Sequence, residues 1–308
     1  MPQPLRPFRF GVNMLTPAPA DEWRAKCRRA EELGYDVITV ADHLGMPAPF
    51  PALVAAAEAT ERPRLGTFVL NAGFWNPALL AREVATTDAL TGGRLELGLG
   101  TGYVQAEHET AGLPWGSPRE RVDHLRRTVE ELDRLLGSDG LPHSRLRSSG
   151  GTPMPQAVQK PRVPLLIGAK GDRMLQLTAE HADIAAFTGA RTNPSGRLEP
   201  LTAEELDERV ATYRRFAAGR TEPAELNLLI QIVIVTDDRG AAIQEWLPRI
   251  PQLTEQQVLE LPIVLVGTLE QVVEQVRAQR ERYGFSYLTV LEPNMETFAP
   301  VVEALRGE

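Results

Sequence analysis

The sequence predicts an α/β protein of 308 residues that folds as one (β/α)8 TIM barrel, with an insertion after the fourth helix. Short apolar runs alternate with amphipathic stretches along most of the chain, which is typical of a parallel sheet whose strands are joined by helices. Eight such runs are each followed by helical sequence, and this favours a closed barrel over an open doubly wound sheet. No internal repeat and no second composition is visible, so a single domain over residues 1–308 accounts for the chain.

The expected strands are rich in β-branched and aliphatic residues and stop at glycine, proline or polar residues. They cover residues 8–14, 36–43, 64–73, 94–102, 163–169, 183–189, 226–235 and 286–293.

The expected helices place apolar residues three and four positions apart. In the first of them, Asp21 is expected to cap the amino terminus and Gly34 to end the helix. The helices cover residues 19–34, 50–60, 76–93, 117–137, 172–182, 202–219 and 268–284, and a last helix follows the eighth strand.

Two segments interrupt the regular alternation. Residues 138–164 are rich in Gly, Ser and Pro and have no periodicity, so we expect a loop or lid there. Residues 191–262 form a variable region in which strand and helix candidates are mixed with irregular sequence.

Composition and charge exclude several classes of function. The chain is 43% hydrophobic and 24% charged, as in globular proteins, and its formal net charge of -8 argues against a nucleic-acid partner. No run of about eighteen apolar residues occurs, so no membrane contact is expected. The amino terminus lacks the apolar core of a secretory signal, which predicts a cytoplasmic protein. The lone Cys27 can form neither an internal disulfide nor a zinc cluster.

Polar residues and glycines gather where the expected strands end. In a barrel of this kind the carboxyl ends of the strands carry the chemistry, so we expect these residues to converge on one mouth. They are Asn13, Asp42, His43, Asn71, Thr101, Gly102, Gly168, Lys170, Thr188 and Glu292, with Gln231 inside the seventh run and Trp75 and Trp115 in loops near the same rim.

The neighbours Asp42 and His43 are the leading acid–base candidates. Imidazole exchanges a proton near neutral pH, and a carboxylate can orient its ring, so we expect Asp42 to hold His43. His108 follows the fourth strand and is compatible with a functional or a structural role. His124 and His181 lie on expected helices and are interpreted as structural.

Metal-dependent hydrolysis is a competing use of a strand-end histidine, but it needs several ligands together. The first strand ends in Asn13 and Met14, without the His-x-His that such sites often use. We therefore expect no metal.

An anion site is expected after the fifth strand. "GLGTG" lacks the full glycine spacing of a dinucleotide-binding fold. In "IGAKGDR", by contrast, Gly168, Ala169, Lys170 and Gly171 lead directly into a helix. Backbone donors at a helix amino terminus, room beside glycine and one ammonium favour a phosphate, although a plain tight turn is the alternative.

Four motifs, taken in order, resemble the bacterial luciferase-like superfamily and especially its oxidoreductases that depend on the deazaflavin coenzyme F420. They are "GVNM", "VITVADH", the block "RLGTFVLNAGFWNPALLAREVATTDALTGGRLELGLGTGY", and "PLLIGAKGDRMLQLTAEHADIAAF". The resemblance covers most of the chain except residues 138–164 and about 191–262.

The resemblance implies a flavin-like cofactor in the barrel mouth, its ring against a bulge in the third strand. Members of the family have a non-proline cis peptide there, so we expect one between Phe68 and Val69 or one position on. The resemblance further implies that Asp42 and His43 lie beside the reactive edge of the ring. Cofactor contacts are implied for Asn13, Asp42, Phe68, Val69, Asn71, Thr101, Gly102 and the phosphate cradle of Gly168, Ala169, Lys170 and Gly171.

The chain departs from the family pattern at one position. Sugar-phosphate dehydrogenases of this family have a glutamate directly after "GTG", whereas this chain has Tyr103, which argues against a sugar phosphate as substrate. Tyr103 is a candidate proton donor or a wall of the pocket, and Glu107 is the nearest carboxylate that can replace the missing glutamate.

The implied activity is hydride transfer between F420 and a small organic substrate, by a reductase or dehydrogenase with His43 as acid or base. One alternative is a monooxygenase that uses reduced FMN. Another is a flavin-binding protein without turnover, against which the presence of Asp42 and His43 argues. The resemblance also implies a homodimer.

Overall fold

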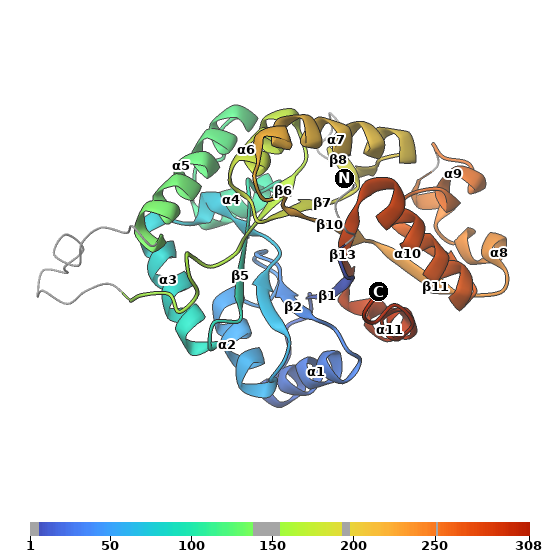
Figure 1. The fold of residues 1–308 in the computed structure, drawn as a ribbon, viewed down its shortest axis with the longest axis horizontal. Helices are drawn as coiled ribbons and strands as arrows, with labels where there is room; N and C mark the ends of the chain where they lie inside the picture. The colour runs from blue at the N-terminus through green and yellow to red at the C-terminus, as the bar shows by residue number, and fades with distance from the viewer. Residues whose placement is uncertain (1–5, 138–154, 193–197, 251) are drawn as a thin grey trace, which may run out of the picture.

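The computed structural model describes residues 6–137, 155–192, 198–250 and 252–308. Eight parallel barrel strands form a closed ring surrounded by helices (Figure 1), which confirms the expected fold. The third barrel strand is interrupted and consists of two pieces, β3 (Arg64–Thr67) and β4 (Leu70–Asn71). Both pieces pair with β5, and the pairing of β3 with β5 closes the ring. The other barrel strands are β1 (Arg9–Met14), β2 (Val37–Val40), β5 (Leu95–Gly100), β6 (Leu165–Ala169), β7 (Ile184–Phe187), β10 (Glu225–Ile230) and β13 (Phe285–Leu291).

Helices follow the barrel strands as the sequence predicts. They are α1 (Ala20–Glu32), α2 (Pro49–Ala59), α3 (Pro77–Leu90), α5 (Pro118–Leu136), α6 (Asp172–His181), α7 (Ala203–Phe216), α10 (Leu269–Tyr283) and α11 (Met295–Ala304). The short α4 (Gln105–Ala111) was not predicted, because seven residues are too few to show a helical period.

Two local predictions about the first helix have different outcomes. Gly34 directly follows the helix's last cap with a φ of 86°, as expected of the glycine that ends a helix. Asp21 is not the cap, because the helix begins after Pro19 and Asp21 lies in its first turn, where a carboxylate still interacts favourably with the helix dipole.

The expected strand over residues 226–235 is wrong in its second half. The chain changes partner at Gln231, whose backbone N–H donates to Ile263. Beyond that point β11 (Ile232–Val235) pairs with β12 (Val264–Gly267) in a separate two-stranded parallel sheet. The variable region also contains the antiparallel pair β8 (Ala190–Thr192) and β9 (Leu198–Pro200) and the short helices α8 (Arg239–Ile243) and α9 (Glu255–Leu259).

Most of the expected insertion, residues 138–154, lies outside the described residues. The part that follows is bound to α3, because the backbone N–H groups of Val158 and Gln159 both donate to the buried Asp88, at 2.7 and 3.0 Å.

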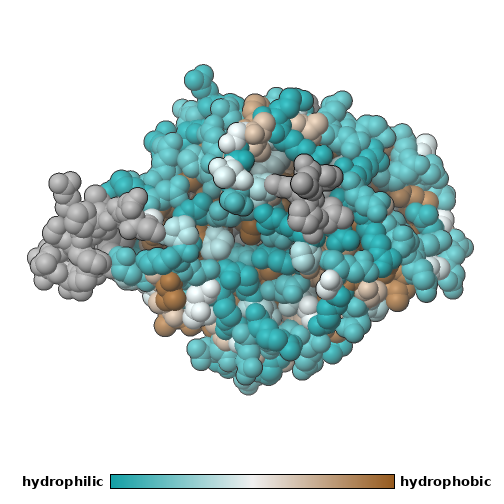
Figure 2. Space-filling view, viewed as in Figure 1, coloured by the Kyte–Doolittle hydropathy of each residue, from teal (hydrophilic) through white to brown (hydrophobic). Residues whose placement is uncertain are grey.

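Apolar side chains fill the barrel and the layer between strands and helices. Phe68, Leu166, Ile184 and Tyr287 belong to one buried cluster contributed by barrel strands and the break in the third strand. The much larger second cluster joins strands to the surrounding helices. The face drawn in Figure 2 is mostly hydrophilic, with scattered apolar side chains. Among the described helices, none is long and apolar enough to span a bilayer.

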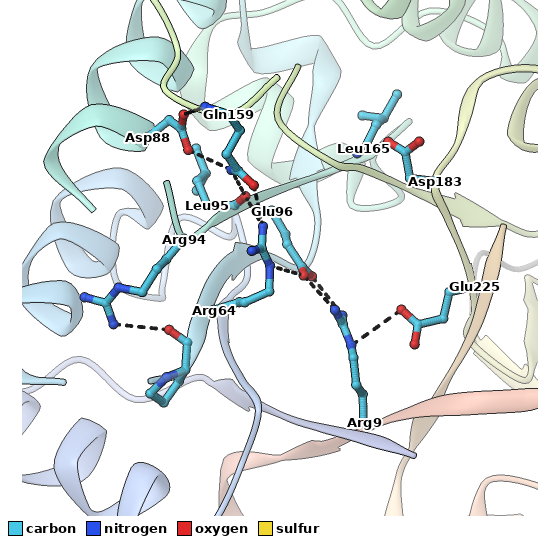
Figure 3. Close-up of polar contacts among 11 residues, drawn as sticks. Arg9, Arg64, Asp88, Arg94, Leu95, Glu96, Gln159, Leu165, Asp183 and Glu225 are labelled. Atoms are coloured by element: carbon cyan, nitrogen blue, oxygen red, sulfur yellow. Dashed lines mark hydrogen bonds and ion pairs between the residues drawn. The ribbon is translucent and has the colours of Figure 1, made fainter. Parts of the chain in front are cut away.

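A layer of charged side chains closes the amino-terminal end of the barrel (Figure 3). The buried Glu96 accepts hydrogen bonds from Arg9 at 3.0 and 3.1 Å and from Arg64 at 2.6 Å. Arg9 also lies 3.5 Å from Glu225. These four residues occupy the first or second positions of their strands, so they lie at the pole opposite the strand ends that carry the polar residues. In barrels of this kind that pole contributes to stability.

Candidate active site

His43 is held at the carboxyl end of the barrel by a carboxylate from another strand's loop. Its Nδ1 lies 3.0 and 3.1 Å from the two carboxylate oxygens of Glu107, which is on α4 after β5. The backbone N–H of Leu44 donates to the same carboxylate at 3.3 Å. Because an ionised carboxylate only accepts hydrogen bonds, Nδ1 of His43 carries a hydrogen. The other ring nitrogen, Nε2, then accepts when the imidazole is neutral.

Tyr103 covers this second nitrogen. Its hydroxyl lies 3.4 Å from Nε2 of His43, and the two rings meet edge to face with centroids 5.4 Å apart. The ammonium of Lys170, after β6, lies 5.9 Å from the centroid of the tyrosine ring. The ends of β2, β5 and β6 therefore contribute to one mouth, as predicted.

Asp42 has partners other than His43. Its Oδ2 accepts hydrogen bonds from the backbone N–H of Asn71 and from the indole of Trp75, both at 3.1 Å. Burial raises the pKa of Asp42, and these two hydrogen bonds oppose part of that rise. The expectation that Asp42 orients the imidazole is wrong, because the carboxylate of Asp42 binds Asn71 and Trp75 instead. The carboxylate that holds the imidazole is that of Glu107.

Asn71 is fixed by a histidine whose role the sequence left open. Its amide nitrogen donates to Nε2 of His108 at 2.8 Å, and its amide oxygen accepts from the backbone of Gly73 at 3.0 Å. His108 donates in turn from Nδ1 to the carbonyl of Pro114 at 2.9 Å and is 1% exposed. His108 is therefore a buried residue that positions Asn71. Glu107 and His108 are adjacent on α4, where consecutive side chains point to different sides, so one reaches the mouth and the other the interior.

Gly102 brings the end of β5 against Asn71. It has a φ of 69°, and a Cβ there would lie 2.6 Å from the Asn71 side chain. The second glycine of "GTG" is thus explained by a close approach to Asn71 that a larger residue would block. Thr101 beside it is half-buried.

The peptide bond between Phe68 and Val69 is cis, as predicted. It lies between β3 and β4, and Val69 is half-buried. The neighbouring strand makes room for this break, since a Cβ at Gly98 would lie 1.9 Å from the carbonyl oxygen of Thr67.

Asn13 lies inside the barrel. It is 4% exposed, and its side-chain oxygen accepts a hydrogen bond from Thr39 at 3.1 Å. Glu292, from the end of β13, accepts hydrogen bonds from the backbone of Leu15 and Thr16 at 2.7 and 2.8 Å and pairs with Lys26 at 3.0 Å. Its carboxylate thus holds the loop after β1.

The segment from Gly168 to Gly171 fits an anionic group. Gly171 is the amino-terminal cap of α6 and provides no side chain to accept from the first backbone N–H groups of that helix. A Cβ at Gly171 would meet no atom within 4 Å, so there is open space in front of the helix. Burial lowers the pKa of the adjacent Lys170 to about 8, and an anion would stabilise its charged form. A phosphate-bearing cofactor therefore suits this edge of the mouth.

Metal chemistry has no comparable basis. Within the part of the chain that the structure describes, no three His, Cys, Asp or Glu side chains are grouped so that they could hold a metal ion.

The family model described as luciferase-like monooxygenase matches residues 5–261. An F420-dependent glucose-6-phosphate dehydrogenase of Kribbella flavida is 30% identical over 300 residues, which is 86% of this chain and 86% of the relative.

Two solved structures share the fold. The coenzyme F420-dependent tetrahydromethanopterin reductase of Methanopyrus kandleri has a TM-score of 0.73 at 18% identity, covering 96% of this chain and 97% of the reductase. A long-chain alkane monooxygenase has a TM-score of 0.71 at 13% identity, covering 98% of this chain and 91% of the monooxygenase. At such identities these two structures show the barrel architecture alone.

Proposed function

Because the chain belongs to the luciferase-like monooxygenase family, we propose that it is an F420-dependent oxidoreductase that transfers a hydride between the deazaflavin and a small organic substrate. The observation that carries the proposal is the pair of His43 and Glu107, 3.0 Å apart, at the carboxyl end of the barrel. When a hydride is added to one atom of a carbon–oxygen or carbon–carbon double bond, a proton is added to the other atom, and oxidation removes both. An imidazole held by a carboxylate is suited to exchange that proton near neutral pH.

The cofactor, when bound, supplies the hydride chemistry, and the chain supplies its position. The phosphate is assigned to Gly168–Gly171 and Lys170, where open space, helix N–H groups and an ammonium come together. The ring is assigned to the half-buried Val69 and Thr101 and to Gly102. Phe68, Asp42, Asn71 and Asn13 are assigned to the surrounding wall, and the structure gives Asn71 and Asp42 supporting hydrogen bonds there.

The substrate is expected to differ from that of the Kribbella relative. The position after "GTG" holds Tyr103, half of whose surface is exposed, in place of the glutamate of sugar-phosphate dehydrogenases. The ammonium of Lys170, 5.9 Å from the ring of Tyr103, is assigned to the phosphate of the cofactor, so it is not counted as a partner for a substrate phosphate. We therefore expect a substrate that is smaller and less charged than a sugar phosphate.

The second candidate is a monooxygenase that uses reduced FMN, because the family includes such enzymes and the alkane monooxygenase has the same architecture. A flavin-binding protein without turnover is the third reading, and the ordered contact between His43 and Glu107 argues against it. A homodimer and a cytoplasmic location stay predictions from the sequence.

Titration of the purified protein with F420 and with FMN, followed by quenching of its tryptophan fluorescence, separates the first two candidates. We expect saturable binding of F420. Tight binding of FMN with no response to F420 would favour the monooxygenase and defeat the leading proposal.

Replacement of the imidazole tests the acid–base assignment. His43→Ala is expected to retain F420 binding and to lower turnover at least about a hundredfold, the usual contribution of a positioned acid or base. His181→Ala is the matched control, since His181 lies on α6 near Asp133 and away from the mouth. Unchanged turnover in His43→Ala would remove the imidazole from the mechanism.

A further inference from the structure

Tyr103 stands at the outer end of a continuous chain of polar contacts. Glu107 binds Nδ1 of His43 at 3.0 Å, and Nε2 of His43 lies 3.4 Å from the hydroxyl of Tyr103. Both Glu107 and Tyr103 follow β5, so one loop and its short helix contact the imidazole at both nitrogens.

The direction of the hydrogen bonds follows from the carboxylate. Since Glu107 accepts from Nδ1, the neutral imidazole has a lone pair on Nε2, and the hydroxyl of Tyr103 donates to it. The separation of 3.4 Å is long, but hydrogen bonds between catalytic groups commonly shorten when substrate binds.

Exposure distinguishes the two rings. The side chain of His43 is 23% exposed, whereas Tyr103 is 49% exposed and covers Nε2. The phenol is therefore the more accessible of the two groups to a substrate.

The surroundings keep the phenol protonated at rest. Burial and the nearby carboxylate of Glu107 both raise the pKa of Tyr103. The ammonium of Lys170 lies 5.9 Å from the ring centroid. Among the described residues, the charged or titratable side chains recorded beside this ring are His43 and Lys170, with Glu107 on the far side of the imidazole.

We infer that Tyr103 is the catalytic residue that exchanges the proton with the substrate oxygen, and that His43 acts through it. The inference rests on the proposed function and specifies the substrate as an alcohol or the corresponding carbonyl compound. Glu107 is then a positioning residue for the relay.

The atoms balance in both directions. In oxidation, the hydroxyl proton of the substrate passes to the oxygen of Tyr103 while the proton of Tyr103 passes to Nε2 of His43. Bound oxidised F420 would take the hydride from the carbon that bears this hydroxyl, and that carbon would become a carbonyl. The imidazolium is left paired with the carboxylate of Glu107. In reduction, bound reduced F420 would supply the hydride to the carbonyl carbon. The hydroxyl proton of Tyr103 would pass to the carbonyl oxygen, and the proton on Nε2 of the His43 imidazolium would pass to the oxygen of Tyr103.

The test compares Tyr103→Phe with Tyr213→Phe. The hydroxyl of Tyr213, on α7, has no hydrogen-bond partner among the described residues, so its removal should leave turnover unchanged. The probes are oxidised F420 with 2-propanol, cyclohexanol and benzyl alcohol, and reduced F420 with the matching carbonyl compounds. Tyr103→Phe is expected to lower kcat at least about a hundredfold, with the Kd for F420 within about twofold of wild type.

A double variant tests whether the two groups act in series. Tyr103→Phe combined with His43→Gln should be no slower than the slower single variant, because groups that act as one unit are lost together. A double variant whose loss is the product of the two single losses would overturn the relay.

A second readout does not depend on turnover. Nitrogen NMR of His43 should show a hydrogen on Nδ1 and an Nε2 resonance that moves in Tyr103→Phe but not in Tyr213→Phe. An Nε2 resonance that is the same in all three proteins would overturn the inference.

The outcomes separate the inference from the proposed function. Wild-type protein that does not bind F420 defeats the proposed function and the relay with it. Wild-type protein that binds F420 but acts on none of the probes overturns the relay and its substrate class while the cofactor assignment stands. Full turnover in Tyr103→Phe overturns the relay alone.

Discussion

At the scale of single residues, the site depends on what each side chain contacts rather than on where it stands in the sequence. Asp42 and His43 are neighbours, yet Asp42 binds Asn71 and Trp75 while His43 binds Glu107. The contact with Glu107 fixes the hydrogen of the His43 imidazole on Nδ1. The carboxylate of Asp42 instead accepts a hydrogen bond from Asn71 at the end of the third barrel strand.

Lys170 gives a prediction at the same scale. Burial lowers its pKa to about 8, so the ammonium loses its proton as the pH rises through that value. If it binds the phosphate of F420, affinity should fall above about pH 8, by roughly tenfold for one lost charged hydrogen bond. The measurement is the Kd for F420 by tryptophan quenching between pH 7 and pH 9.5.

Lys170→Arg is the matched variant, because a guanidinium stays charged over this range. It should bind F420 with little change across the same pH values. A fall in affinity of the same size in Lys170→Arg would assign the pH dependence to another group.

At the scale of elements, the third barrel strand and β5 shape the mouth together. The strand breaks at the cis peptide between Phe68 and Val69, and Gly98 and Gly102 let β5 and the loop after it approach the two flanking pieces. Asn71, at the end of β4, is then locked by His108 from α4. The wall of the mouth is thus one unit built from two strands and a short helix.

Gly102→Ala should damage this unit. The φ of 69° costs an alanine about 1 to 2 kcal/mol, and its Cβ would lie 2.6 Å from Asn71. We expect a lower melting temperature and weaker F420 binding, because Asn71 has to leave its partners. Thermal unfolding and fluorescence titration measure the two effects.

Gly45→Ala is the control, because a Cβ there would meet no atom within 4 Å. It should leave stability and binding near those of wild type. Equal melting temperatures for Gly102→Ala and Gly45→Ala would show that the close approach at Gly102 is not needed.

At the scale of the whole molecule, one pole of the barrel holds the candidate active site and the other holds a charged layer that we expect to stabilise the fold. The carboxyl pole carries the mouth, and the amino pole carries the layer of Arg9, Arg64, Glu96 and Glu225 (Figure 3). Burial raises the pKa of Glu225 although Arg9 opposes the rise. Because this layer lies at the pole opposite the mouth, its loss should lower the stability of the fold more than it lowers turnover.

Glu96→Ala should lower the free energy of unfolding by about 2 to 4 kcal/mol, because it removes the carboxylate that accepts the hydrogen bonds of Arg9 and Arg64 and leaves Arg9 with Glu225 alone. Glu96 is 3% exposed, whereas Glu303 in the exposed pair with Arg306 should contribute less than about 0.5 kcal/mol. Denaturant unfolding compares Glu96→Ala with Glu303→Ala, and F420 binding by the folded fraction should be unchanged in both. Similar unfolding free energies in the two variants would contradict a structural role for the layer.

The amino-acid sequence was enough to place most of the barrel strands, most of the helices and several of the residues at the mouth. Hydrophobic periodicity is local, so it fixes where a strand or helix lies and which end of a parallel strand is polar. The position of the cis peptide between Phe68 and Val69 was predicted from the family resemblance of the block that begins "RLGTFVLNAG". Where a strand was only an apolar run, as in residues 226–235, the pattern did not show that the chain changes sheets at Gln231.

The hydrogen-bond partners of the side chains at both poles became clear only from the tertiary structure. Glu107 is 64 residues from His43, and Glu96 is 87 residues from Arg9. His108 turned out to hold Asn71, and Glu292 turned toward the loop after β1. These contacts depend on strand register and loop geometry, which bring distant segments within 3 Å of one another, and no local pattern along the chain records that distance.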